Sequence, residues 1–496
     1  MTMYQCKRFA VVLAVVLVTA PALAFAQGAY VDPYTLANRA SVGGAARRGD
    51  VSPATTIRTD ERYNNGMLFS GPRGWAYWNY LADPQGYQNP NLWPDKRPTY
   101  LFGEMSIPAG ADLTVHGRFP HVRFFNFSIY LFEKNTFVNA TGGSIDGYDM
   151  EPDPGSTNPY RVGADRDAAN RNFTIHIIAK DAPANPTGRA KNTVYLGNAD
   201  QTIFGGFRMY VSDSGYDGTG WGPGDGPSHE GPGLTYEATL ADGTKLPEAE
   251  ANTRFGKMMG DAPPPINADD WYKLVNSPAN DPCMTLATAP ACPNSQFFLF
   301  TGIKDALYGA FMPPAERAKI AKPASSDGGA NASTAYLVNY TSRVYGPLYV
   351  FRAKLPTFPD TWANTKIMPD GEVKYWSVAT MATLTNGSLW DGVFDMQVPV
   401  GKDGFYTIVV SRPEDRPKNA TAENGIAWID WGPGEGLGDP RNRKDWGALL
   451  MRFMVPQKNW KNNPLQPGDL ATVMGPYYPR GYYTTKAEFE AKGPKK

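Results

Sequence analysis

The chain has 496 residues, with 48 basic and 48 acidic side chains, so its formal net charge is zero. That balance excludes the electrostatic footprint of a protein that binds nucleic acid or anionic membranes. Glycine (51) and proline (44) are abundant and aromatic residues reach 13%, which predicts many short strands joined by turns. Such a length exceeds what one core usually covers, so we expect two domains or one duplicated sandwich.

The N-terminus has the pattern of a cleaved secretory signal peptide over residues 1–26. Lys7 and Arg8 precede an apolar run at residues 9–18, and alanines flank Phe25 near the expected cleavage point. The run is too short to span a bilayer comfortably, and no later segment holds about 18 consecutive apolar residues. We therefore expect a periplasmic or secreted protein without an integral membrane segment.

Five regions follow the signal peptide in chain order. Residues 27–97 form a polar, extended lead-in with an aromatic cluster at 75–80. Residues 98–245 and 336–475 carry alternating, strand-like patterns and are predicted as two β domains. Residues 246–335 are predicted as a short helical connector, and residues 476–496 as a tail that crosses the surface.

The connector contains two predicted helices and two cysteines. Residues 267–275 have the pattern of a capped helix with an acidic first turn, and residues 313–320 begin with prolines, which a first helical turn tolerates. Cys283 and Cys292 are separated by eight residues. In an exported chain this pair favours a local disulfide over a metal site, which would need more ligands nearby.

An internal repeat relates the two β domains. Four pairs of segments recur in the same order, namely 98–108 with 347–356, 122–132 with 373–378, 173–177 with 406–410, and 208–211 with 452–455. Chance similarity of apolar strands could produce any single pair, but the ordered set indicates an ancient duplication. We predict a mainly β fold with two related antiparallel β-sandwich or jelly-roll-like domains.

At residues 122–132, 375–377, 403–408, 428–433 and 449–453 the chain resembles a known bacterial family. This family consists of exported proteins made of two linked domains of unknown function, numbers twelve fifty-four and twelve fourteen. The resemblance covers about half of the chain and implies a β-rich, exported, two-domain protein. It implies no reaction, cofactor or catalytic residue.

Acidic residues near strands are the first candidates for catalysis. Secreted β proteins rich in aromatic residues often act on sugars, and a glycosidase needs two suitably spaced carboxylates. Asp430 lies between Trp428 and Trp431, and glycines open a loop directly after them. Asp430, Glu104 and His121 are the candidate catalytic residues. The two tryptophans are candidate ligand-binding residues, with core packing as the alternative.

Two arginines occupy equivalent positions of the repeat. Arg208 and Arg452 each lie in a strand with apolar neighbours. An arginine there must pair with a carboxylate or reach solvent, since burial without a partner is costly. The alternatives are a structural salt bridge in each half, or a pair of anion anchors that bind a carboxylate or phosphate.

No cofactor is expected, and two metal readings remain as alternatives. His116 and His121 flank a predicted bend, where they could converge with Glu104 on a transition metal. The acidic loop at residues 146–153 offers oxygen ligands at the short spacing that calcium sites use. His176 matches an apolar position of the second repeat and is expected to pack there, and His229 lies in a glycine-rich loop.

Three classes of function remain open from the sequence. The leading hypothesis is an exported β protein that binds a small molecule or glycan in a cleft between two related halves. A hydrolase or lyase that uses carboxylates in the same cleft is the alternative, and a structural envelope protein is the third class. The sequence leaves open whether the protein is an enzyme.

Overall fold

The computed structural model describes residues 75–79, 95, 97–133, 136–214, 216, 220, 234–257, 296–300, 333–382, 388–432, 434 and 445–494. Several predictions fall outside these residues. They are the signal peptide, the disulfide between Cys283 and Cys292, the two connector helices at 267–275 and 313–320, and His229.

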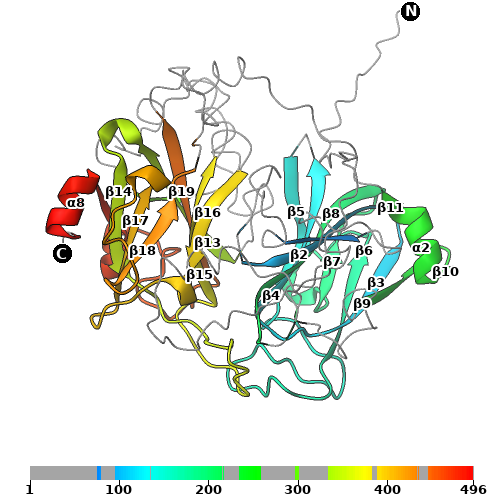
Figure 1. Ribbon diagram of the computed structural model, residues 1–496. Coiled ribbons are helices and arrows are strands. Elements are labelled where there is room, and N and C mark those ends of the chain that lie inside the picture. Colours follow the sequence, from blue (N-terminus) through cyan, green and yellow to red (C-terminus); the bar gives the residue numbers. More distant parts are fainter. Residues whose placement is uncertain are drawn as a thin grey trace, which may run out of the picture.

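The protein is mainly β and is built from two halves, as predicted (Figure 1). In the first half one curled sheet has the order β1-β2-β8-β4-β5-β7-β6-β3-β9-β10, with β11 paired to β2. The strands are β1 (Trp75–Asn79), β2 (Thr99–Ile107), β3 (Asp112–Arg118), β4 (Val122–Glu133), β5 (Thr136–Asp146), β6 (Asn172–Ile178), β7 (Thr193–Tyr195), β8 (Gln201–Ser212), β9 (Leu234–Thr239), β10 (Lys245–Leu246) and β11 (Gly256–Lys257). Helix α2 (Glu248–Phe255) follows β10, and Phe125, Phe173 and Phe207 pack together in the core.

The second half contains two sheets, β12-β13-β19-β15-β16 and β18-β17-β14-β20. Its strands are β12 (Phe298–Phe300), β13 (Thr334–Ser342), β14 (Leu348–Lys354), β15 (Tyr375–Ala382), β16 (Ser388–Phe394), β17 (Phe405–Ser411), β18 (Ile426–Asp430), β19 (Trp446–Met454) and β20 (Arg480–Thr484). Helices α7 (Leu470–Met474) and α8 (Lys486–Lys492) follow late in the chain. The two sheets enclose a core that contains Trp376, Tyr406 and Met451.

The two halves share one strand topology. The path β2-β8-β4-β5 of the first half corresponds to β13-β19-β15-β16 of the second, and β7-β6-β3-β9 corresponds to β18-β17-β14-β20. Even the pairing senses agree, because β6 with β7 and β17 with β18 are parallel whereas their neighbours are antiparallel. The predicted repeat is therefore confirmed. The prediction of antiparallel sheets holds except for these two parallel pairs, β6 with β7 and β17 with β18.

One pairing of the repeat was wrong. Residues 98–108 contain β2, whose counterpart is β13, whereas residues 347–356 contain β14, the counterpart of β3. Both segments carry an aromatic pair and a proline step, but the neighbours in the sheet decide equivalence. Two other pairings agree with the register, since Arg208 lies opposite Asn126 as Arg452 lies opposite Ser377. The pairing of 173–177 with 406–410 agrees with the topology, because these residues lie in the equivalent strands β6 and β17.

The C-terminal segment is part of the second half rather than a surface tail. Strand β20 pairs with β14, and its Tyr482 and Tyr483 pack against different apolar clusters of this half. Helix α8 begins with a capping box of Thr485 and Glu488 and buries Phe489. The second half therefore extends to residue 492.

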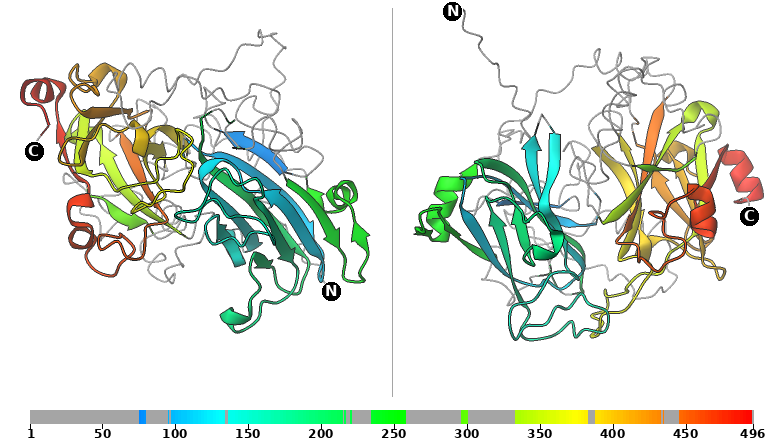
Figure 2. Two further views of the ribbon diagram at one scale, coloured as in Figure 1. Left: turned by 90° about the horizontal axis from the view of Figure 1, so that it is seen from below. Right: turned by 180° about the vertical axis from the view of Figure 1, so that it is seen from behind.

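The halves meet along a contact surface that we call the seam (Figure 2). Its apolar part combines residues of both halves, namely Phe124, Tyr210 and Val211 with Trp362, Tyr375, Phe394, Met396, Met454 and Val455. The rings of Tyr210 and Tyr375 are 5.0 Å apart. Because strand side chains alternate between faces, these residues point away from the core of their own half.

The seam uses equivalent positions of the repeat. Phe124 lies opposite Tyr210 in one half, as Tyr375 lies opposite Met454 in the other. The next residues, Val211 and Val455, both have positive φ, at 56° and 49°. A β-branched residue rarely adopts that conformation, so its presence at both positions indicates a shared local constraint where the halves meet.

The cores of the two halves differ in polarity. Phe125 and Phe173 of the first half correspond to Trp376 and Tyr406 of the second. Tyr406 Oη and Trp376 Nε1 are buried and have no hydrogen-bond partner among the described residues. The second half therefore carries polar atoms inside its core at positions that are apolar in the first half.

Candidate functional site

Arg208 and Arg452 converge at the seam. Each lies on an interior strand of its sheet, Arg208 on β8 opposite Tyr100 and Arg452 on β19 opposite Tyr336. Burial raises the pKa of Tyr100, and both guanidinium groups are close enough to lower it. The structure thus brings together two arginines that the sequence predicted as a related pair.

Arg208 is held by its own half. Its guanidinium donates hydrogen bonds to Asn126 Oδ1 at 3.1 Å and to Tyr130 Oη at 2.6 Å. It also lies 5.7 Å from the centre of the Tyr130 ring. Arg208, Asn126 and Tyr130 are all buried. Neutral oxygens and an aromatic ring therefore orient this guanidinium.

Arg452 faces a carboxylate. Its Nη1 lies 3.7 Å from Asp95 Oδ2, and Ser377 Oγ donates a hydrogen bond of 2.6 Å to the same oxygen. The backbone N–H of Asp95 donates to Tyr100 Oη at 2.9 Å. Asp95 is 2% exposed, so the seam encloses one carboxylate from the segment before β2.

Hydrogen-bond donors are concentrated in this part of the seam. The two guanidiniums, the Ser377 hydroxyl and the Tyr100 and Tyr130 hydroxyls lie in a region that is shielded from water. Buried arginines bind carboxylates and phosphates strongly because their hydrogen bonds are charge-assisted and water does not compete. In this structure the two guanidiniums and the Ser377 hydroxyl contact Asn126, Tyr130 and Asp95.

Two further basic residues cross the seam. Arg123 Nη1 donates to Asp395 Oδ1 at 2.6 Å, and both side chains are fully buried. Lys374, the equivalent residue of the second half, is 4% exposed and lies 6.0 Å from the Tyr148 ring of the first half. The cation that recurs in the repeat therefore contacts the opposite half in both copies.

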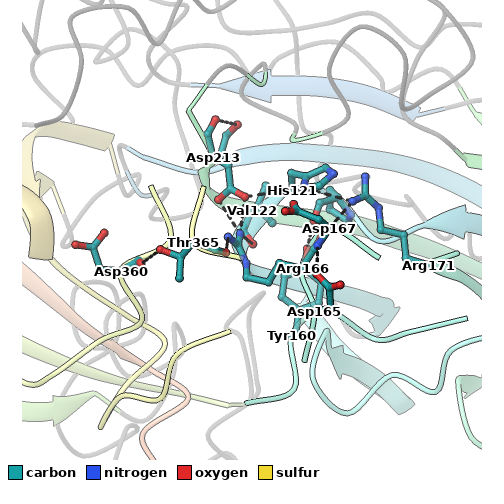
Figure 3. Close-up of polar contacts among 12 residues, drawn as sticks. His121, Val122, Tyr160, Asp165, Arg166, Asp167, Arg171, Asp213, Asp360 and Thr365 are labelled. Carbon is teal, nitrogen blue, oxygen red and sulfur yellow. Dashed lines mark hydrogen bonds and ion pairs between the residues drawn. The ribbon is translucent and has the colours of Figure 1, made fainter. Parts of the chain in front are cut away.

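His121 belongs to a separate polar network beside the seam (Figure 3). Arg166 donates to both oxygens of Asp213, at 2.7 Å and 2.5 Å, and to the carbonyl of Thr365 at 2.9 Å. Arg171 Nη1 donates to His121 Nδ1 at 3.4 Å. An arginine can only donate, so the proton of a neutral His121 lies on Nε2. The contacts support a tethering role for His121, with Nδ1 already engaged.

Asp430 lies at the end of β18, among other contacts. Its Oδ1 accepts a hydrogen bond from the N–H of Gly432 at 2.9 Å, and its own N–H donates to Asp391 Oδ2 at 2.9 Å. Burial raises the pKa of Asp430, and the nearby charges of Asp391 and Glu414 raise it further. Such a carboxylic acid can hold its proton at higher pH than an exposed aspartate.

The structure does not bring the two tryptophans to the arginine pair. Trp428 Nε1 donates to Ser411 Oγ at 2.9 Å, and the Arg416 guanidinium covers the indole at 4.5 Å. Trp431 is 2% exposed and packs in the core of the second half. The alternative role of core packing holds for Trp431. Glu104 lies on β2, where its backbone pairs with Phe204 and Lys257.

The predicted metal ligands have other partners. His116 is exposed and contacts Thr174 Oγ1 at 3.2 Å, whereas His121 is buried. His176, expected to pack, instead forms a half-exposed ion pair with Asp112 at 3.2 Å, since its face of β6 is open to water. Within the described part of the chain, no three or more His, Cys, Asp or Glu side chains form a group that could hold a metal ion.

The acidic loop is structured by protein contacts. Asp146 is buried and accepts hydrogen bonds from Asn126 Nδ2 at 2.9 Å and Tyr148 Oη at 3.4 Å. Glu151 forms a half-exposed ion pair with Arg161. Burial raises the pKa of Asp146 to about 6, so this carboxyl group is poorly solvated in the folded protein.

Sequence reasoning missed Asp95, Ser377 and Asp395. Asp95 lies in the lead-in, where no periodic pattern marked it, and Asp395 follows β16 without an acidic neighbour. Arg123 carried a usable signal, because a basic residue recurs at the same position of the second repeat as Lys374. A cation kept in an otherwise apolar strand indicates a partner outside its own half.

The fold and the seam define a β protein made of two like halves that meet through equivalent residues. The described residues contain no helix long and apolar enough to span a membrane. No family model matches the chain, and a comparison with curated proteins finds no match. The resemblance to the exported two-domain family stays a prediction.

Two solved structures align with most of this chain at low sequence identity. An uncharacterised protein from Burkholderia cenocepacia aligns with a TM-score of 0.42 and 13% identity, over 85% of this chain and 84% of its own. The VPA0106 protein from Vibrio parahaemolyticus aligns with a TM-score of 0.34 and 12% identity, over 79% of this chain and 90% of its own.

Proposed function

We propose that the protein binds an anionic small molecule or acidic glycan at the seam, with Arg208 and Arg452 as its anchors. One observation carries the proposal: two buried arginines at equivalent positions of the repeat, one from each half, both lie close enough to Tyr100 to lower its pKa. Two independent structural salt bridges would not require the arginines to converge. A shared anion explains why both halves retain the same cation at this position.

The surroundings of the pair support this proposal. Ligand sites occur preferentially between domains, where a small relative movement admits the ligand and closure excludes water. The hydroxyls of Tyr130 and Ser377 and the amide of Asn126 supply neutral polar groups beside the two cations. Such a mixture fixes the orientation of an anion and leaves the apolar part of the seam for the remainder of the ligand.

Isothermal titration calorimetry on the mature protein tests the proposal, with benzoate and inorganic phosphate as probes. We expect saturable binding of at least one probe to the wild type. Arg208→Gln should weaken it by at least roughly tenfold, since a charge-assisted hydrogen bond contributes about 1.5 kcal/mol or more. Arg208→Lys keeps the charge but loses the planar fork, and should also weaken binding.

Arg352→Gln is the matched control, because Arg352 forms a partly exposed ion pair with Asp403 away from the seam. Its probe affinity should equal that of the wild type. The proposal fails if neither probe binds the wild type, or if folded Arg208→Lys binds as tightly as the wild type does.

A secreted hydrolase is the second candidate, favoured by the raised pKa of Asp430. A carboxylic acid whose pKa is raised can keep the proton that a general acid donates. Hydrolysis of 4-nitrophenyl acetate and 4-nitrophenyl glycosides by the wild type, lost in Asp430→Asn, would support it. Turnover that is absent in the wild type or unchanged in Asp430→Asn would contradict it.

A further inference from the structure

We infer that Lys374 is the cation of a second, separate site at the seam, which binds one small monovalent anion of the size of formate. This inference goes beyond the proposed function, because the site uses neither Arg208 nor Arg452. It starts from the basic residue that recurs in the repeat, which forms an ion pair in one copy and none in the other.

The register of the sheets shows that Gly147 of the first half corresponds to Asp395 of the second. Gly147 follows the residue opposite Asn126, and Asp395 follows the residue opposite Ser377. Asn126 and Ser377 are themselves equivalent, because each lies opposite the recurring arginine of its half. The first half therefore has a glycine where the second half has the aspartate that pairs with Arg123.

The two halves contact each other across the seam in related ways, but only one of the two contacts is an ion pair. Arg123 Nη1 donates to Asp395 Oδ1 at 2.6 Å. Lys374, which is equivalent to Arg123, contacts the corresponding segment of the first half at Tyr148, the residue after Gly147. An arginine and an aspartate are thus replaced by a lysine and a glycine, and this replacement removes the carboxylate but keeps a cation.

The ammonium of Lys374 is buried without a counter-ion in contact. Lys374 is 4% exposed, and within the described part of the chain no carboxylate pairs with it and no oxygen accepts a hydrogen bond from its ammonium. The centre of the Tyr148 ring is 6.0 Å away, at the outer limit of a cation–π attraction. The charge of Asp370 favours the ammonium, but Asp370 is exposed and water screens it. Burial accordingly lowers the pKa of Lys374.

Asp146, the buried carboxylic acid beside Tyr148, does not supply the counter-ion. It accepts hydrogen bonds from Asn126 Nδ2 at 2.9 Å and from Tyr148 Oη at 3.4 Å. Burial raises the pKa of Asp146 to about 6, whereas an ammonium in contact would lower it. The polar atoms of Asp146 are engaged within its own half, so the charge of Lys374 is left to be balanced by an anion from solution.

The chemistry of the site identifies the class of anion. A buried charge without a counter-ion is costly, so an anion that pairs with Lys374 stabilises the folded protein. One ammonium balances one negative charge, and its compact form suits a small anion rather than a ligand that needs a planar, two-pronged donor. Formate, the smallest carboxylate, carries the same group that Asp395 presents to Arg123.

Melting temperatures of the mature protein, measured against sodium formate concentration at constant ionic strength, test the inference. Formate should raise the melting temperature of the wild type in a saturable way. Lys374→Met keeps an unbranched side chain but removes the charge, and should weaken the apparent affinity for formate at least roughly tenfold. Lys374→Gln, which also removes the charge, should behave alike. Without formate, Lys374→Met should melt above the wild type, because a buried charge without a counter-ion destabilises the fold.

Lys402→Met is the matched control, since Lys402 is exposed, and it should bind formate as the wild type does. Arg208→Gln should also keep its affinity for formate, because the site is separate from the arginine pair. Formate binding that is lost in Arg208→Gln and kept in folded Lys374→Met would overturn the inference and leave the proposed function standing. No saturable effect of formate on the wild type would also overturn the inference, whereas the proposed function depends on benzoate and phosphate.

Discussion

Tyr406 occupies the position in the second half that Phe173 occupies in the first, and both side chains are fully buried. Burial alone raises the pKa of the Tyr406 phenol, which has no hydrogen-bond partner among the described residues. A buried polar group without a partner costs about 1–3 kcal/mol of stability. The Tyr406 hydroxyl therefore destabilises the folded protein unless a molecule inside the core binds it.

We expect Tyr406→Phe to stabilise the protein by about 1 kcal/mol, because the mutation removes an unsatisfied hydroxyl and keeps the ring. Urea unfolding measures the change. Tyr349→Phe is the matched control and should destabilise, since Asn339 Nδ2 donates to Tyr349 Oη at 2.8 Å. A loss of stability in Tyr406→Phe would show that the hydroxyl has a partner.

Asp146 makes stability depend on pH. Its pKa in the folded protein is about 6, above the ordinary value of 3.8, because burial disfavours the charged form. The folded protein therefore binds this proton more tightly than the unfolded chain does. The resulting stabilisation is complete below pH 3.8 and is lost as the pH rises to about 6.

The free energy of unfolding of the wild type, relative to Asp146→Asn, should fall by about 2.4 kcal/mol between pH 4 and pH 7. Urea unfolding of both proteins across this range measures the difference, in which the titration of other groups cancels. A constant difference would mean that Asp146 ionises as an exposed aspartate does.

The sequence identified single residues best where the same residue type occurs at equivalent positions of both repeats. Arg208 and Arg452 could be identified as a pair because each copy supports the other, and in the structure both lie near Tyr100. Asp95 could not be found, because its partners Arg452 and Ser377 are about 280 or more residues away in the chain. Trp431 was proposed as a ligand-binding residue but packs in the core. A tryptophan next to an acidic residue looks the same in the sequence whether it lies in a core or in a binding site.

At the scale of elements, the alternation of apolar residues predicted the strands well. Period-2 burial is seen in β3, β6 and β9, where inward residues are buried and outward ones are more exposed. Strand β20 was missed because its five residues lie among glycines and prolines, and its partner β14 is more than 120 residues earlier. Short strands owe their stability to such distant pairing rather than to local preference.

Gly481 tests whether β20 is integral to the second half. A Cβ at this position would lie 2.1 Å from Tyr349 Oη, which is buried in the core. We expect Gly481→Ala to destabilise the protein by about 1–3 kcal/mol, since overpacking moves a core side chain. Gly188→Ala, whose nearest contact would be an ordinary 3.6 Å, should have little effect in the same urea unfolding measurement. Equal effects would indicate that β20 packs loosely.

At the scale of the whole molecule, the duplication was predictable but the seam was not. Four repeated segments were enough to indicate two related halves, whereas contacts between the halves leave no periodic pattern in the sequence. Arg123 with Asp395 and Lys374 with Tyr148 cross the seam from equivalent positions. The two halves therefore meet as the subunits of a symmetric dimer do, with the same patch used twice.

The ion pair of Arg123 and Asp395 should couple the stability of the halves. Asp395→Asn leaves a buried guanidinium without its counter-ion, which should cost about 3–5 kcal/mol in urea unfolding. Asp403→Asn removes a partly exposed ion pair with Arg352 and should cost less than about 1 kcal/mol. Similar effects of both mutations would mean that water reaches the seam.

The central claim is that the seam binds an anion through Arg208 and Arg452. The most direct measurement is a crystal structure of the protein with 4-bromobenzoate, with diffraction recorded at the bromine absorption edge. We predict an anomalous peak within the apolar part of the seam, with the carboxylate in hydrogen-bond distance of Arg452. A bromine site elsewhere on the protein, or none at saturating concentration together with no phosphate at the seam in a matched phosphate soak, would contradict the claim.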